Sequence, residues 1–135
     1  MITDNDRPRF QSYFDTCLQL MRGRNYQRAG QLGEEYPGEF KCAYHDEHGQ
    51  ACHIGALLPE EIRPSLANTD CNVLHLHMHA QWQLFPKQLA NDIQNKKAFF
   101  NRLQEIHDDC DDDEDDYEGM MRRFAEHFDL SYEAP

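Results

Sequence analysis

Apolar residues recur at three- and four-residue spacings near the start of this chain, and this periodicity constrains the fold more than any other feature. The pattern follows an Asp6-Arg7-Pro8 segment, where the proline is placed for the first turn of a helix, and it ends near Gly23. Such spacing gathers the apolar side chains into one stripe on a helix, so it predicts an amphipathic helix that packs on a core. The stripe consists of Phe10, Tyr13, Phe14, Cys17, Leu18 and Met21.

The last third of the sequence predicts further helices of the same kind. A helical pattern after Pro86 continues to Ile106 with a break near Asn95, and a final helix carries apolar residues from Tyr117 to Phe128. If part of this last apolar face stayed exposed, it would suit a homodimer. The residues of that face are Tyr117, Met121 and Phe128.

The middle of the chain alternates instead. Phe40 to Tyr44 alternates apolar and polar residues, residues 46–49 have turn chemistry, and residues 51–58 are mostly apolar. This order predicts a β-hairpin whose second arm runs into a helix start near Pro59, with Pro64 ending that piece. We therefore expect one domain, residues 1–135, with a mainly helical α+β fold that contains a small β-hairpin or short antiparallel sheet.

A second alternating segment carries three histidines. On a strand, His75, His77 and His79 would share one face, whereas on a helix His75 and His79 would stack. The regular alternation favours the strand. From one strand face these imidazoles could hold zinc, nickel or copper, with Cys71 as a further ligand, but three alternate residues on one strand rarely converge on a metal, so a polar strand face is the favoured explanation.

Acidic residues are concentrated in one tract. The formal net charge is −12, and ten of the 25 acidic residues lie from Glu105 to Glu118, where there is no Lys or Arg. Outside this tract, 15 acidic and 13 basic residues nearly balance. A short linker that caps the last helix needs only two or three carboxylates, so the excess indicates another use. The candidate binding residues are Asp108, Asp109, Asp111, Asp112, Asp113, Glu114, Asp115 and Asp116.

Two uses of the tract can be compared. An EF-hand loop requires Gly at position six and Glu at position twelve, and counting from Asp109 these positions hold Glu114 and Met120. The calcium-loop pattern is therefore absent, and weak cation binding is what remains of that idea. Alternatively, dense carboxylates can imitate the phosphate charge that basic grooves attract. The choice between a solvated linker and such a surface stays open at this stage.

Two segments of the chain resemble a known family. One is Cys42-Ala43-Tyr44, then Gly49, then Cys52-His53-Ile54-Gly55-Ala56-Leu57-Leu58-Pro59-Glu60, and the other is Leu103-Gln104-Glu105-Ile106-His107-Asp108. Together they resemble a family of small bacteriophage and prophage proteins. The resemblance implies a phage setting and implies no activity. His45 and His53 depart from that pattern, which has a basic and a small apolar residue at these places.

Cysteine and histidine also cluster between residues 42 and 53. This cluster predicts either a metal site or packed thiols, and Cys42 or Cys52, with His45 or His53 as the base, could serve as a nucleophile. The five cysteines are scattered and no secretory signal begins the chain, so we expect reduced, mostly buried thiols. The metal candidates are Cys42, His45, His48, Cys52, His75, His77 and His79.

These observations favour a binding protein over an enzyme. Common phosphate-binding, dinucleotide-binding and hydrolase motifs are absent from the sequence, and so is a basic stripe for direct nucleic-acid binding. We expect a phage-type accessory protein of the bacterial host cytoplasm, with no membrane span and no required cofactor. It would bind a protein with a basic surface, such as a host nucleic-acid-binding or defence protein. The alternative is a small metal-binding or thiol-dependent protein, with zinc or another divalent metal, centred on residues 42–53.

Overall fold

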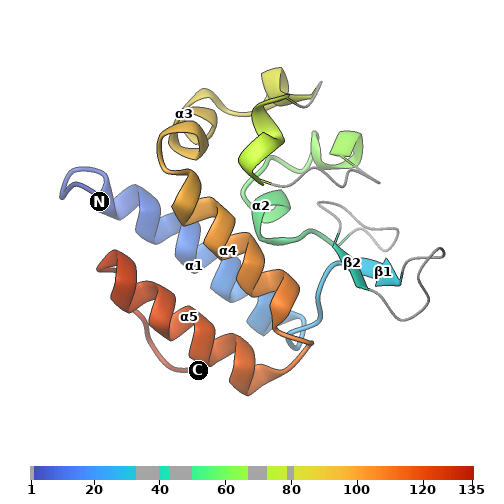
Figure 1. Ribbon diagram of the computed structural model, residues 1–135, viewed down its shortest axis with the longest axis vertical. Helices are drawn as coiled ribbons and strands as arrows, with labels where there is room; N and C mark the ends of the chain where they lie inside the picture. The colour runs from blue at the N-terminus through green and yellow to red at the C-terminus, as the bar shows by residue number, and fades with distance from the viewer. Residues whose placement is uncertain (1, 33–39, 43–49, 67–72, 79–80) are drawn as a thin grey trace.

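Three long helices lie side by side and form the body of the protein (Figure 1). The computed structural model describes residues 2–32, 40–42, 50–66, 73–78 and 81–135. The long helices are α1 (Arg7–Gly23), α4 (Lys97–Asp109) and α5 (Glu114–Phe128). The shorter elements are α2 (His53–Ala56), α3 (Lys87–Asn95) and the 3-10 helices η1 (Arg63–Leu66), η2 (Val73–Met78) and η3 (Trp82–Leu84).

Aromatic rings from the three long helices form the centre of the core. Phe10 of α1 meets Phe99 of α4 edge to face at 4.9 Å, and Phe14 of α1 stacks on Phe124 of α5 at 5.8 Å. Phe99 also contacts Phe124 at 5.0 Å, so one cluster joins all three helices. Each fully buried Phe contributes about 1.5–3 kcal/mol through removal of its surface from water. The predicted apolar stripe of α1 is confirmed, because its members are buried or packed against this core.

The helix boundaries follow from local sequence. Helix α1 begins directly after Asp6 and ends at Gly23, as predicted. The predicted break near Asn95 is also confirmed: Lys96 has φ −131° and ψ 50°, so α3 and α4 are separate helices. The apolar face of α5 lies in the core, with Tyr117 and Met121 fully buried. Phe128, the third residue of the predicted dimer face, is partly buried and packs against the same core, so the homodimer stays a prediction.

The expectation of an α+β fold is wrong, because the protein is all-α. Among the described residues, the β content is one antiparallel pair of three-residue strands, β1 (Gly30–Leu32) and β2 (Phe40–Cys42), which is too short to form a layer of the fold. Strand β2 pairs with the upstream β1 and not with residues 51–58. Residues 53–56 form α2, because the sulfur of Cys52 accepts the Gly55 N–H at 3.4 Å and caps a helix there.

Two other local predictions are also wrong. The segment from Val73 to Met78, predicted as a strand, is the 3-10 helix η2, and His79 lies outside the described residues. Among the side chains of this helix that the structure describes, Val73 and Leu76 are buried, and their spacing of three residues matches the turn of a 3-10 helix. Pro64 lies inside η1 rather than ending a helix that starts near Pro59. Among the described residues, no helix has the length and apolar character required to cross a membrane.

Candidate functional site

The acidic tract forms the connection between α4 and α5. It runs from the last residues of α4, through a tight turn, into the first turn of α5. In this turn the N–H of Asp113 donates to the carbonyl oxygen of Cys110 at 2.9 Å, and the two central residues have positive φ, 53° at Asp111 and 57° at Asp112. This combination corresponds to a type I′ turn, which aspartate tolerates better than most residues do. The tract is therefore a defined turn and not a flexible linker.

Arg28 holds this turn against the body of the protein. Its guanidinium donates to Asp112 Oδ1 at 3.1 Å and to the carbonyl oxygen of Asp108 at 2.8 Å, and its backbone N–H donates to Asp112 Oδ1 at 2.8 Å. Burial raises the pKa of Asp112, but the hydrogen bonds and the positive charge of Arg28 outweigh it and leave that pKa below its ordinary value. The Arg28 side chain is 12% exposed, so it contacts the turn from the inner side.

Several residues of the tract have structural roles that cannot be recognised from the sequence alone. Asp108 accepts hydrogen bonds from Gln104 at 2.9 Å and from His107 at 3.0 Å. Asp113 is the N-cap of α5, and its Oδ1 accepts the N–H of Asp116 at 2.9 Å. The acids in the first helical turn also interact favourably with the helix dipole.

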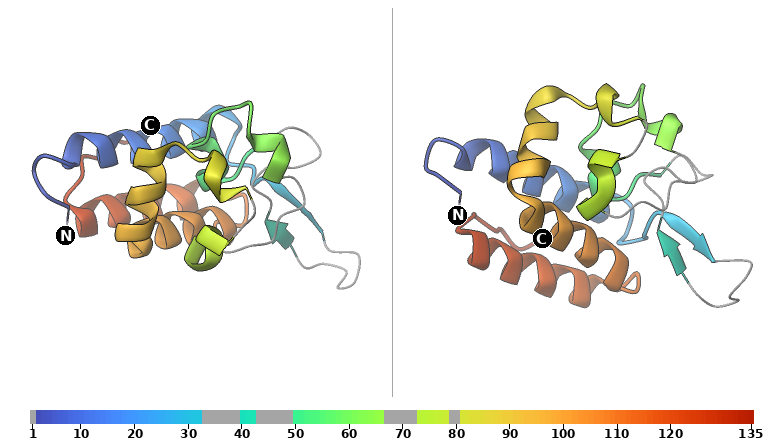
Figure 2. Two further views of the ribbon diagram at one scale, coloured as in Figure 1. Left: turned by 90° about the horizontal axis from the view of Figure 1, so that it is seen from above. Right: turned by 45° about the horizontal axis from the view of Figure 1, so that its top comes forward.

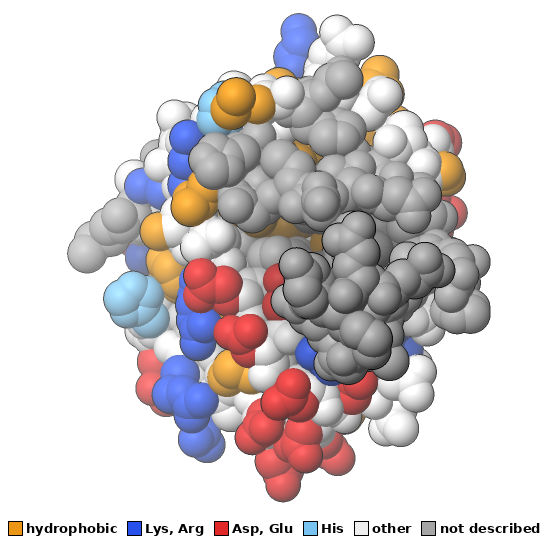
Figure 3. Space-filling model, turned by 45° about the vertical axis from the view of Figure 1, so that its right-hand side comes forward, with side chains coloured by type: hydrophobic (Ala, Val, Ile, Leu, Met, Phe, Trp, Pro, Cys, Tyr) orange, Lys and Arg blue, Asp and Glu red, His pale blue; other side chains and the backbone are white. Residues whose placement is uncertain are grey.

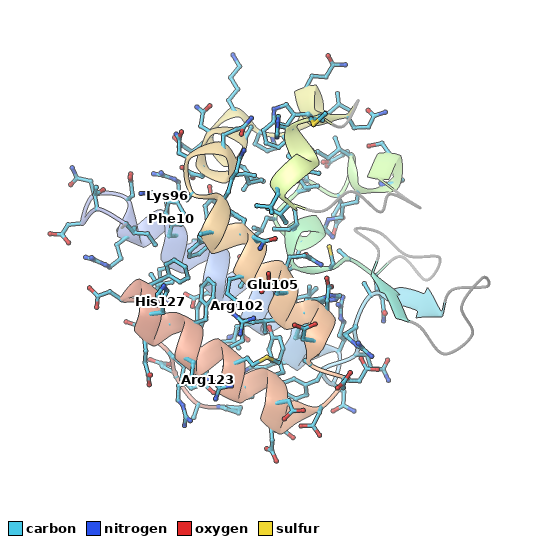
Figure 4. The ribbon with its side chains drawn as sticks, in the orientation of Figure 1. Phe10, Lys96, Arg102, Glu105, Arg123 and His127 are labelled. Carbon is cyan, nitrogen blue, oxygen red and sulfur yellow. The ribbon has the colours of Figure 1, made fainter. Side chains whose placement is uncertain are left out.

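Apart from Asp108, the carboxylates from Asp109 to Asp116 form an exposed surface, although some of them also make structural contacts. Figure 3 shows acidic side chains gathered on the lower part of the face that carries the connection between α4 and α5. Every acid from Asp111 to Asp116 is exposed, and so is Asp109. We call these seven residues the acidic surface. Further along α5 the charge changes sign: Arg123 lies past the middle of the helix, near Arg102 of α4 (Figure 4).

A buried histidine lies beneath the acidic turn. His107 is fully buried, its Nδ1 contacts Asp108 Oδ1 at 3.0 Å, and its Nε2 accepts the N–H of Ala29 at 3.0 Å. Arg24 Nη2 lies 3.2 Å from the same Nε2. Because Nε2 accepts, the proton belongs on Nδ1, which donates to the carboxylate. Burial lowers the pKa of His107, even though Asp108 opposes that shift, which favours the neutral ring.

A second buried histidine extends the network into the core. The ring of His53 lies 5.4 Å from that of His107, its Nδ1 is 2.7 Å from the carbonyl oxygen of Leu103, and its Nε2 is 2.8 Å from the hydroxyl of Tyr117. A carbonyl oxygen can only accept, so Nδ1 carries the proton and Tyr117 donates to Nε2. Burial and the nearby His107 lower the pKa of His53 well below its ordinary value.

The described parts of the two segments on which the predicted phage resemblance rests meet in this network. His53 follows the N-cap of α2 and donates to Leu103 of α4, while the side-chain oxygen of Gln104 accepts the N–H of Ile54 at 3.2 Å. The two segments are recognisable in the sequence but their contact is not, and neither Arg24 nor Arg28 was predicted to take part. Nothing in the sequence spacing signals the contact of Arg24 with His107 or that of Arg28 with Asp108, because each pair is about 80 positions apart.

The described metal and thiol candidates do not form a site. Cys52 is buried and its sulfur caps α2, and both ring nitrogens of His53 are hydrogen-bonded. His77 is partly exposed, and its buried Nδ1 has no hydrogen-bond partner among the described residues. Within the part of the chain that the structure describes, no group of three His, Cys, Asp or Glu residues could hold a metal ion. The candidates that lie outside the described residues, at least in their side chains, are Cys42, His45, His48, His75 and His79.

Comparison of the chain with models of protein families, with curated proteins and with solved structures found no match.

Proposed function

We propose that this protein is a phage-type accessory protein that binds another protein through its acidic surface. The partner presents a basic surface of the kind that normally binds nucleic acid, and occupation of that surface inhibits a host nucleic-acid-binding or defence protein. The observation that carries the proposal is the exposure of seven carboxylates, Asp109 at the end of α4 and the six acids from Asp111 to Asp116 on the turn and the first turn of α5.

The fixed geometry of the turn supports binding. Arg28 and the hydrogen bond between Asp113 and Cys110 hold the carboxylates in place before any partner arrives. A pre-ordered surface loses less conformational entropy on binding than a flexible tail does. Crowded like charges repel one another and destabilise a fold, so a surface of this density has a cost that binding would explain.

Structural roles account for only part of the tract. Helix capping explains Asp113, and the helix dipole favours the first-turn acids of α5. Neither explains Asp109 or Asp111, which are exposed and precede the helix. Asp111 lies 3.8 Å from Arg28, but its side chain is 80% exposed. The metal- or thiol-dependent alternative is not carried further, because no described contact favours it.

Capture from a bacterial lysate with three forms of the full chain tests the proposal. The first is the wild-type chain. The second replaces four acids of the surface by their amides, Asp109→Asn, Glu114→Gln, Asp115→Asn and Asp116→Asn. The third removes the same charge from exposed acids elsewhere, Asp4→Asn, Glu60→Gln, Glu61→Gln and Glu126→Gln.

The proposal predicts that the first and third forms capture the same nucleic-acid-binding protein and that the second does not. Circular dichroism verifies that all three forms fold. Equal capture by all three forms, or capture that persists unchanged in strong salt, would contradict the proposal.

A further inference from the structure

The segment after α5 runs back along α1 instead of projecting into solvent (Figure 2). Asp129 has φ 57° and ψ 48°, the left-handed conformation that ends a helix and reverses the chain, and the N–H of Leu130 donates to Ala125 at 2.8 Å. We call residues 129–133 the strap. The strap lies against α1 and α5 and is held by hydrogen bonds with side chains of both helices.

Most of the contacts to the strap recognise its backbone. The side-chain amide of Gln11 pairs with Ser131 in both directions: Oε1 accepts the Ser131 N–H at 2.8 Å, and Nε2 donates to the Ser131 carbonyl oxygen at 3.0 Å. Asp15 accepts the second N–H of the same amide at 2.9 Å and so fixes its orientation. Two residues further along, Arg22 donates to the carbonyl oxygen of Glu133 at 2.7 Å. Backbone contacts at alternate residues are a general way to bind an extended peptide of any sequence.

One side chain of the strap is recognised specifically. The Tyr132 hydroxyl donates to Glu118 Oε1 at 2.8 Å, its ring lies 5.7 Å from the guanidinium carbon of Arg22, and it packs against the core. Arg22 and Glu118 are themselves ion-paired and only 16% and 11% exposed. The site therefore selects an aromatic ring that carries a hydroxyl.

The strap does not fill its groove. A hollow of about 280 Å³ remains between the strap and α1, and its lining includes Leu18, Gln19 and the strap residue Ser131. Serine is small, so a peptide with a larger residue at this position would fill space that the strap leaves open. The groove therefore has room for a peptide with a larger residue at the position of Ser131.

We propose that this groove is a recognition site for an extended, tyrosine-bearing segment of a partner protein, and that the strap occupies it in the absence of that partner. The contacts define the ligand: a tyrosine at the position of Tyr132, free backbone N–H and C=O groups at the position before it, and a residue larger than serine there. The site is independent of the acidic surface, so either can fail without the other.

A peptide-binding experiment on the full chain tests this inference. The probe is a labelled synthetic peptide with the sequence of residues 129–135, and its binding is measured by fluorescence anisotropy. A tethered strap competes at an effective concentration in the millimolar range, so the wild-type chain should bind the probe weakly. The Tyr132→Ala variant should bind it at least about tenfold more tightly, because its own strap is weakened.

Three controls define the result. A probe with alanine in place of tyrosine should bind the Tyr132→Ala variant at least about tenfold more weakly, and addition of Gln11→Ala to that variant should weaken the tyrosine probe similarly. A probe with leucine in place of serine should bind more tightly than the original. If a folded Tyr132→Ala variant binds no probe, or binds the tyrosine and alanine probes equally, the inference is overturned.

Two further outcomes also decide the question. Ser131→Pro, which removes the N–H that Gln11 accepts, provides a second way to release the strap. If neither this variant nor Tyr132→Ala folds by circular dichroism, the strap is an inseparable part of the core and the proposal fails. If added wild-type chain displaces the bound probe, the occupant is the strap of a second copy, and the assignment to another protein is wrong.

Discussion

Removal of one buried hydroxyl should destabilise the protein strongly, although it changes a single atom. Tyr117 is fully buried, and its hydroxyl donates to Nε2 of His53 at 2.8 Å, the nearer of its two acceptors, since the carbonyl oxygen of Cys17 lies 3.2 Å away. Tyr117→Phe leaves that nitrogen buried with no donor. An unsatisfied buried acceptor costs about 1–3 kcal/mol, so the free energy of unfolding should fall by about that amount.

Urea unfolding followed by circular dichroism measures this loss. For a small protein the denaturant slope is about 1–3 kcal/mol per molar urea, so the midpoint should fall by roughly 1 M while the slope stays unchanged. Tyr26→Phe is the matched control. Tyr26 is buried and its ring lies 5.6 Å from that of Tyr117, but its hydroxyl has no hydrogen-bond partner among the described residues. This control should change stability by less than about 0.5 kcal/mol.

A double-mutant cycle tests the assigned partner. If the cost of Tyr117→Phe comes from the unpaired nitrogen, it should shrink in a His53→Leu background, with a coupling energy of about 0.5–3 kcal/mol. Equal losses for Tyr117→Phe and Tyr26→Phe, or no coupling to His53, would refute the proposed network.

Three further predictions follow from buried groups. First, folding lowers the pKa values of His53 and His107, so as the pH falls the unfolded chain takes up protons before the folded chain does. The free energy of unfolding should therefore be at its full value above about pH 6.5 and fall below that pH by up to about 1.4 kcal/mol per pH unit for each ring. Urea midpoints that do not change from pH 7.5 to 5.5 would contradict this prediction. Second, Asp92→Asn removes the buried carboxylate that Arg9 contacts at 2.7 and 2.8 Å, and it should cost about 3 kcal/mol in the same assay, whereas the surface control Glu105→Gln should cost less than about 1 kcal/mol. Third, the described cysteines are buried, so iodoacetamide should modify them, as read by peptide mass spectrometry, only after denaturation; a native reaction would revive the thiol-dependent alternative. These cysteines are Cys17, Cys52 and Cys110.

The long helices could be predicted from the sequence because the apolar residues of their buried faces recur at regular spacings. Helix α1 and the break between α3 and α4 are set by residues within one or two turns, such as the apolar stripe after Pro8 and the non-helical Lys96. The same kind of rule failed for Val73 to Met78, because a short alternating run fits a strand and a 3-10 helix equally well. The burial of Val73 and Leu76, which are three residues apart, fits the 3-10 helix and does not fit one face of a strand.

The candidate site was predicted only in part for a related reason. The sequence locates the carboxylates, since they are consecutive, but it cannot separate Asp108, which binds His107 and Gln104, from its exposed neighbour Asp109. That distinction depends on contacts across the fold, such as the one from Arg28 to the acidic turn. Such contacts leave no periodic trace in a single sequence.

The salt dependence of binding to the captured partner tests the central claim most directly. Binding would be measured at several salt concentrations for the wild-type chain, the form with four neutralised acids in the acidic surface, and the form with four neutralised acids elsewhere. Affinity should fall steeply with salt for the wild-type chain and for the form with four neutralised acids elsewhere. Neutralisation of Asp109, Glu114, Asp115 and Asp116 should both weaken binding and reduce its dependence on salt. A salt dependence that is the same in all three forms would contradict the claim that the acidic surface binds the partner.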